Sequence, residues 1–221
     1  LAIPHNGNLS NGRMFAAQRF DGTPLSKDYA ERRQRWEPIQ EIIQSKGASE
    51  SHPKLSPSDE FLDHGIAGWE LGNLTLSGSP LTREMMPTSY ARGGLMRGLE
   101  HEQKLGINPF KFGLIGSSDA HNALPFVEED SFFGKFPGQE PSADRWKQRS
   151  ATGEGEGGAA RYTWQYLAAG YAAVWATENT REAVFDALTR PETYGTSGTR
   201  MTVRFSGGYG FSPEGAPPRY L

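Results

Sequence analysis

Three histidines follow short apolar runs, and two of them have an acidic residue two positions earlier. Asp119 and His121 come directly after the run FGLIG, Glu50 and His52 lie in the segment SESHP, and His5 lies in IPHNGN. Side chains at positions i and i+2 of an extended segment point to the same side, so an acid and its histidine can reach one ion. The sequence therefore predicts a metal centre, and Asp119-x-His121 is its best-supported part.

The composition decides which ligands such a centre can use. The 221 residues include no cysteine, which excludes disulfides, thiolate metal sites and a cysteine nucleophile. Carboxylate and imidazole ligands without thiolate suit Zn, Mn or Fe, and a carboxylate can bridge two ions. We therefore expect divalent Mn, Zn or Fe on His5, Glu50, His52, Asp119 and His121.

Each of these signals also has a purely structural interpretation. An aspartate that follows two serines near a turn is often only a helix cap. His5 stands before Asn-Gly turn chemistry and can hydrogen-bond a loop carbonyl, and SESHP can be only a polar loop.

Two basic residues are candidates for binding the anionic part of a substrate. Lys46 stands shortly before SESHP, and Arg200 follows the segment ETYGTSGT. Ser117 and Ser118 lack the G-x-S-x-G elbow of serine hydrolases, so we reject a serine nucleophile. Lys46 and Arg200 are the predicted catalytic side chains outside the metal ligands.

The overall charge and hydropathy exclude other classes of partner. The net charge of −3 gives no basic excess for nucleic acid or an anionic membrane surface. No run of 18 apolar residues is present, so no transmembrane helix is expected. We expect a soluble protein; its composition leaves a periplasmic or secreted location of the full-length protein open, and it does not indicate the oligomeric state.

Strands and helices alternate along the chain, and this alternation predicts an α/β protein with a parallel sheet. Strands are expected at 1–4, 39–45, 110–115, 171–176, 193–197 and 200–205, and helices at 28–36, 56–64, 89–105 and 181–190. In such folds the active site lies at the carboxyl ends of the strands, where the candidate histidines fall.

The domain organisation is expected to be one α/β unit over 1–199, with 122–160 as a lid or insertion loop. Residues 200–221 are expected to begin a following β segment or tail. The apolar start and the Gly- and Pro-rich end favour a fragment of a longer protein.

The segments IPHNGN, SESHP, KFGLIGSSDAH and ETYGTSGTR closely resemble a large bacterial family catalogued as a domain of unknown function. That family is related to the PHP (polymerase and histidinol phosphatase) metallo-hydrolases, and the resemblance covers nearly the whole chain. It implies the C-terminal part of a distorted PHP-like (β/α) barrel that holds two or three ions. It also implies hydrolysis of phosphoesters or, in carbaryl-hydrolase-like relatives, of carbamate esters.

Carried over by position, His5, Asp119 and His121 resemble metal ligands of that family, whereas SESHP occupies a place without an agreed ligand. The H-x-H motif that opens such barrels, and the later His and Glu ligands, are absent from these residues. They are expected upstream of Leu1, so this chain alone is expected to be inactive or to bind metal weakly.

The resulting hypothesis is a metal-dependent hydrolase, most simply a phosphoesterase, in which a metal-bridging hydroxide attacks a small, anionic ester. One alternative keeps the metal and changes the bond to a carbamate or carboxylic ester. The other alternative is a non-catalytic binding or scaffolding domain.

Overall fold

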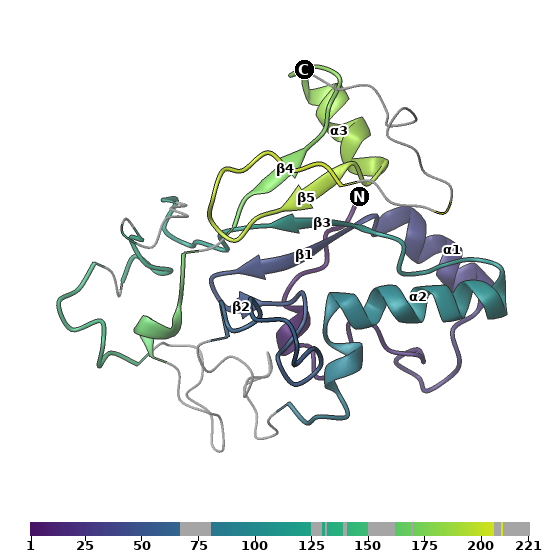
Figure 1. The fold of residues 1–221 in the computed structure, drawn as a ribbon, viewed down its shortest axis with the longest axis horizontal. Coiled ribbons are helices and arrows are strands. Elements are labelled where there is room, and N and C mark those ends of the chain that lie inside the picture. The colour runs from purple at the N-terminus through teal and green to yellow at the C-terminus, as the bar shows by residue number, and fades with distance from the viewer. Residues whose placement is uncertain are drawn as a thin grey trace.

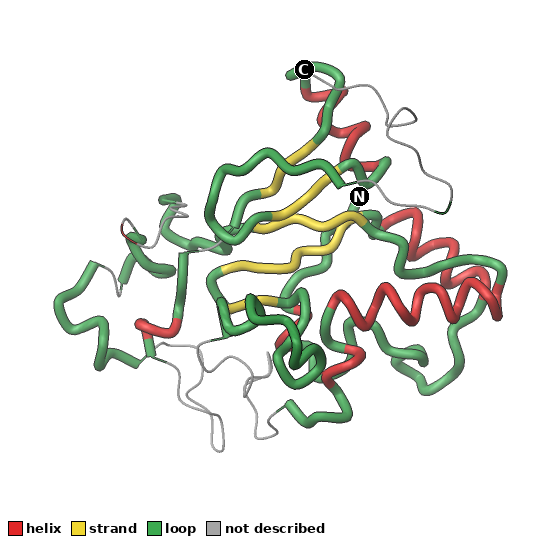
Figure 2. The backbone as a smooth tube through the Cα atoms, viewed as in Figure 1, coloured by secondary structure: helices red, strands yellow, loops and turns green. Residues whose placement is uncertain are grey.

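The computed structural model describes residues 1–66, 81–124, 130, 132–138, 141–149, 162–168, 170–205 and 209. Short strands and three α-helices are joined by long loops (Figure 2). The helices are α1 (Lys27–Trp36), α2 (Ala91–Leu105) and α3 (Arg181–Thr189), with 3-10 turns η1 (Gly7–Leu9), η3 (Met86–Thr88) and η5 (Thr163–Gln165). The strands are β1 (Ile39–Gln44), β2 (Gly47–Ala48), β3 (Gly113–Gly116), β4 (Ala172–Val174) and β5 (Thr193–Gly195).

The central pair of strands is β1 and β3, and it is parallel as predicted. All six residues of β1 are buried, and its isoleucines favour extended backbone. Ile39 pairs with Gly113 and Glu41 with Ile115, while β2 pairs with the end of β1 in the antiparallel sense. Because β1 and β3 run in the same direction, their carboxyl ends meet at one edge of the sheet (Figure 1).

The second sheet corrects the expected parallel arrangement. Strands β4 and β5 flank α3, as the sequence predicted, but they pair antiparallel, with Val174 opposite Thr193. The reason is the short connection from α3 to β5. Within it Glu192 N donates to Ala187 O at 3.0 Å, and Trp175 N, just after β4, donates to Glu192 O at 2.9 Å. The chain therefore re-enters the sheet beside the end of β4 and not beside its start.

The two sheets meet along a glycine seam, which consists of Gly116, Gly170 and Gly195. A Cβ on Gly116 would lie 2.6 Å from the Thr196 carbonyl oxygen, and one on Gly195 would lie 2.5 Å from the Gly116 nitrogen. Backbone therefore packs directly on backbone at this seam, and only glycine fits there.

Three of the four predicted helices, those at 28–36, 89–105 and 181–190, are confirmed as α1, α2 and α3 with small shifts at their ends. Ser26 caps α1 by accepting from Tyr29 N at 3.2 Å, and Gly106 ends α2 in the left-handed conformation at φ 74°. The cap of α3 is Thr180, whose side chain accepts from Ala183 N.

The main core lies between α2 and the sheet. Phe15 and Phe110 meet edge to face with ring centres 5.5 Å apart, and Ile42, Ile43 and Leu167 complete the buried cluster. Burying side chains of this size contributes about 2 kcal/mol each.

Three predicted elements are wrong. Residues 1–4 form no strand and Leu1 and Ile3 are exposed, although Pro4 O accepts from Glu41 N. Residues 200–205 also form no strand. Residues 56–64 form turns because the Asp59 carboxylate takes the Phe61 amide at 3.2 Å, which competes with helical hydrogen bonding.

The described part of the chain is mixed α/β, and its strands form a three-stranded and a two-stranded sheet that do not close into a barrel. Positions 125–129, 131, 139–140 and 150–160 of the predicted lid lie outside the described residues, as do 206–208 and 210–221 of the predicted C-terminal segment. No described helix is both long and apolar enough to span a membrane.

Candidate functional site

The candidate site lies where β1 and β3 end. β1 leads into Lys46, and β3 leads through Ser117 to Asp119 and His121. Ser117 N donates to Ile43 O at 3.0 Å, so the segment after β3 stays hydrogen-bonded to β1 for one residue beyond the strand. This edge therefore collects polar side chains from both strands, as the parallel arrangement predicts.

Asp119 and His121 point at each other. His121 Nε2 lies 3.1 Å from Asp119 Oδ1. Asp119 has φ 49°, in the left-handed region, so a backbone kink brings the pair together. The extended i, i+2 geometry that motivated the prediction is not what the chain adopts here. The pair nevertheless presents one oxygen and one nitrogen donor at a common point.

Two lysines bind the Asp119 carboxylate. Lys46 Nζ and Lys135 Nζ both donate to Oδ2, Lys135 at 2.5 Å, and Lys135 also donates to the Asp119 carbonyl at 2.5 Å. The Lys135 side chain is only 2% exposed. Burial and the neighbouring Lys135 lower the pKa of Lys46 to about 7, and burial lowers the pKa of Lys135 to about 8. Both amines can therefore exchange a proton near neutral pH.

The same two lysines act on His121. Burial lowers the pKa of His121, and the charges on Lys135 and Lys46 lower it further. The imidazole is thereby held in the neutral form that binds metal ions.

A buried carboxylate, Glu41, lies behind the pair. It accepts from the Ser117 hydroxyl and from Asn6 N, the latter at 3.4 Å. Burial raises its pKa, while Ser117, His5 and Lys46 oppose that rise. His5 is itself exposed, and this electrostatic link to Glu41 places it on the same side of the sheet end.

The second predicted pair, Glu50 and His52, does not converge. Glu50 Oε1 accepts from Arg92 Nε at 2.9 Å and from Nη2 at 2.5 Å. His52 is buried, its Nδ1 accepts from Lys54 N at 3.0 Å, and its ring contacts Tyr90. Glu50 serves an ion pair with α2, and His52 serves packing.

Arg200 packs against Tyr171. Its Nε donates to the Tyr171 hydroxyl at 3.1 Å, and its guanidinium lies 5.0 Å from the ring centre. The structure thus brings together Asp119, His121 and Lys46 from the predicted set.

Sequence reasoning missed Lys135 and Glu41. Glu41 carried a signal, because a glutamate inside the predicted strand that contains IQEIIQ must find a polar partner when the strand is buried. Lys135 carried none: it lies 16 positions from Asp119 in the segment assigned to a lid, and only folding brings it to the carboxylate.

The donors at Asp119 and His121 fit a divalent ion in type and spacing. Two ligands that each lie about 2 Å from one ion are separated by about 3 Å, close to the observed 3.1 Å. In the part of the chain that the structure describes, no group of three or more histidine, aspartate or glutamate side chains is arranged to hold a metal. Among the described residues, the structure therefore offers two protein ligands for a metal ion, Asp119 and His121.

Comparison with known proteins gives a family and no function. Residues 1–218 match the family model described as "Protein of unknown function (DUF3604)". No curated protein and no solved structure gave a significant match.

Proposed function

We propose that this chain, which belongs to the DUF3604 family, is part of a metal-dependent hydrolase whose ion is held by Asp119 and His121. The observation that carries the proposal is the 3.1 Å approach of Asp119 Oδ1 and His121 Nε2 at the shared exit of two parallel strands. We also propose that the family is related to the PHP hydrolases and that this fold is part of their barrel. The four quoted motifs support that relationship.

The ion would supply an activated water and polarise the ester bond. The chain's own residues have distinct tasks. Burial and the charges on Lys135 and Lys46 lower the pKa of His121, which favours the neutral form that binds metal ions. The other expected ligands were His5, Glu50 and His52. His5 stays a candidate, whereas Glu50 is engaged by Arg92 and His52 by Lys54 and Tyr90.

Lys46 and Lys135 favour an anionic ester as the substrate. Two ammonium groups converge on one carboxylate, so an incoming phosphoryl oxygen would meet positive charge on entering. With a pKa of about 7, Lys46 can also give a proton to the departing oxygen. A carbamate or carboxylic ester would use the ion in the same way and would gain less from the second ammonium.

A second candidate function is supported by the same ion pairs. Asp119 is already neutralised by two lysines, and such a cluster can serve only to fix the loop that carries it. In that case the chain is a binding or scaffolding domain without catalysis.

The first test is metal binding by equilibrium dialysis against Zn²⁺ and Mn²⁺, with metal measured by mass spectrometry. The test variant combines Asp119→Asn with His121→Ala. The control variant combines Glu50→Gln with His64→Ala, which also removes one acid and one histidine. We expect binding by the wild type and the control, and at least about tenfold weaker binding by the test variant.

Equal binding by the test and control variants would refute the proposed ligands. No binding by a folded wild type would favour the binding domain. Where metal binds, a chromogenic panel of a phosphomonoester, an acetate ester and an aryl carbamate then separates the alternatives. The phosphomonoester should turn over fastest, and Lys46→Met should raise its KM more than that of the neutral esters.

A further inference from the structure

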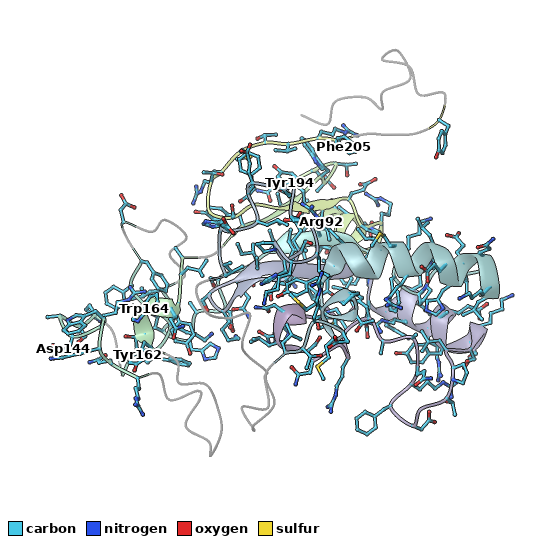
Figure 3. The ribbon with its side chains drawn as sticks, turned by 60° about the horizontal axis from the view of Figure 1, so that its bottom comes forward. Arg92, Asp144, Tyr162, Trp164, Tyr194 and Phe205 are labelled. Atoms are coloured by element: carbon cyan, nitrogen blue, oxygen red, sulfur yellow. The ribbon has the colours of Figure 1, made fainter. Side chains whose placement is uncertain are left out.

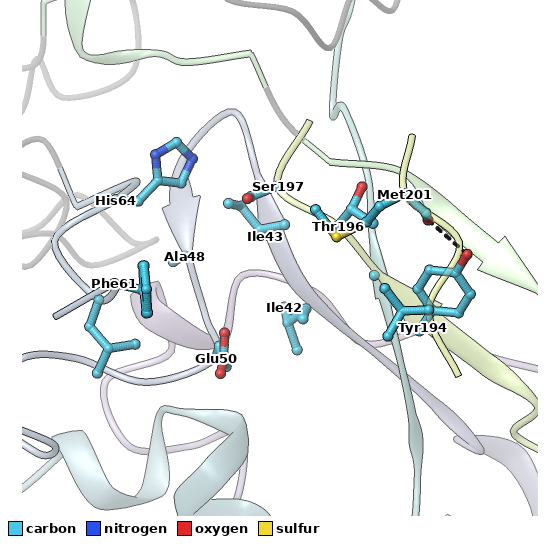
Figure 4. Close-up of a pocket in the computed structure, with 13 residues that line it drawn as sticks. Ile42, Ile43, Ala48, Glu50, Phe61, His64, Tyr194, Thr196, Ser197 and Met201 are labelled. Carbon is cyan, nitrogen blue, oxygen red and sulfur yellow. Dashed lines mark hydrogen bonds between the residues drawn. The ribbon is translucent and has the colours of Figure 1, made fainter. Parts of the chain in front are cut away.

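A cavity of about 540 Å³ lies apart from the Asp119 cluster, between the 48–64 segment and residues 194–203. Figure 4 shows Phe61, His64 and Glu50 on one side and Tyr194, Thr196 and Met201 on the other, with Ile42 and Ile43 from β1 between them. Cavities of about 300 to 1,000 Å³ are the size that proteins use for small molecules.

The walls of this cavity are mainly apolar, and several of them reach solvent. Phe61 is 78% exposed, Met201 53% and Val203 42%, yet all three line the cavity together with the isoleucines. Large apolar side chains left open to water around a concave surface favour an apolar occupant.

The inner wall carries a buried hydroxyl that lacks a partner. Thr196 is 8% exposed, and its Oγ1 has no hydrogen-bond partner among the described residues. Its backbone is fully used, with N donating to and O accepting from Tyr171 at 3.2 Å. Leaving a buried hydroxyl unpaired is unfavourable, and a polar atom of an occupant would pair with it.

The lining of the cavity includes one carboxylate, that of Glu50. The guanidinium of Arg92 that pairs with Glu50 also pairs with Asp59 at 2.8 Å. Arg92 projects from the start of α2 (Figure 3). Two carboxylates share one guanidinium, so this group has a net charge of −1 and favours a cationic ligand over an anionic one.

We propose that this cavity is a binding site for a small amphipathic cation: an apolar body, an inner hydroxyl that bonds Thr196 Oγ1, and an amine near Glu50. The cavity shares no lining residue with the Asp119 cluster, and this proposal does not rest on the hydrolase proposal. Its ligand has the opposite charge to the ester proposed for the metal centre.

The test uses three probes that dissect these contacts, and phenylacetate as an anionic comparison, with affinities measured by isothermal titration calorimetry. Tyramine has the hydroxyl, the ring and the amine; phenethylamine lacks the hydroxyl, and 4-ethylphenol lacks the amine. We expect tyramine to bind more tightly than either partial probe.

Thr196→Val removes the inner hydroxyl at almost constant shape. We expect it to weaken tyramine about threefold to tenfold and to leave phenethylamine unchanged. The matched control is Thr193→Val, because Thr193 Oγ1 is also buried without a partner among the described residues but does not line the cavity. That control should change neither affinity.

Glu50→Gln tests the carboxylate, and it keeps an oxygen that can accept from Arg92. It should weaken both amines about twofold to fivefold at low salt and leave 4-ethylphenol unchanged. No binding of tyramine to the folded wild type would overturn the proposal. Equal losses with Thr193→Val and Thr196→Val, or tighter binding of phenylacetate than of phenethylamine, would overturn it as well.

Discussion

Two segments of this protein carry the same pattern of an acid two positions before a histidine, and they fold in opposite ways. Asp119 and His121 turn toward each other and toward two lysines, whereas Glu50 turns out to Arg92 and His52 turns in to Tyr90. The spacing is identical, so spacing did not decide the outcome. The backbone did: a left-handed residue at the end of a paired strand bends the first segment back on itself.

The difference also separates what each residue does for the protein. In the first pair the acid is half-buried in an ion cluster and the histidine is 52% exposed. In the second pair the histidine is 3% exposed and the acid is on the surface. We therefore expect stability and metal binding to respond to different members of the two pairs.

The largest expected effect comes from Asp119→Asn. It leaves two buried ammonium groups without a counter-charge, and we expect it to lower the free energy of unfolding by about 3 kcal/mol at pH 7. Urea denaturation with EDTA present measures this without any contribution from bound metal. A loss below about 1 kcal/mol would mean that the lysines find other partners.

His52→Ala is expected to come next. It removes a buried ring that contacts Tyr90 and accepts from Lys54 N, and should cost about 2 kcal/mol. His121→Ala, at an exposed ring, should cost less than about 0.5 kcal/mol while weakening metal binding. Thermal unfolding of both variants tests this difference in stability. Equal losses of stability in His52→Ala and His121→Ala would contradict it.

The pH dependence of stability should distinguish the Asp119 cluster. In the unfolded chain Lys46 keeps its proton to its ordinary pKa of 10.5, but in the folded protein its pKa is about 7. Between these values the unfolded state binds more protons, so this residue makes stability rise with pH from about 7 to about 10. Lys46→Met should flatten that rise by about 2 kcal/mol, measured by urea denaturation across this range with EDTA. An unchanged slope would contradict the lowered pKa.

Glu50→Gln should have the smallest effect on stability. The Glu50–Arg92 pair is about 40% exposed on both sides, and such pairs contribute about 0.5 kcal/mol or less. A loss as large as that of Asp119→Asn would remove the contrast between the two segments. Denaturation at low and high salt completes the measurement, since a surface pair weakens with salt.

The sequence was informative wherever local chemistry decides structure. The predicted helix at 89–105 is confirmed as α2, which ends before Gly106, and the run FGLIG contains β3 and leads into Ser117. The glycines inside α2 looked unfavourable for a helix, but a Cβ on Gly94 would lie 2.6 Å from the Phe15 ring, so close packing explains that residue.

The features that the sequence did not predict depend on contacts between distant segments. No local pattern links Lys135 to Asp119, and the antiparallel pairing of β4 with β5 follows from how α3 returns. The turns at 56–64 had a proline and acids suited to a helix start, but Asp59 is taken by Arg92 and by the Phe61 amide. A sequence pattern does not show with which distant residue a charged side chain will pair in the folded protein.

The glycine seam also has a mechanical consequence. Thr196, in the wall of the apolar cavity, touches the Gly116 backbone through its carbonyl, and Gly116 precedes Asp119 by three residues. No side chain stands between the two segments to absorb a displacement by changing rotamer. A shift of a few tenths of an ångström in the cavity wall would press directly on the strand that ends at the Asp119 loop, so the stiffness of this junction ties the positions of the two sites together.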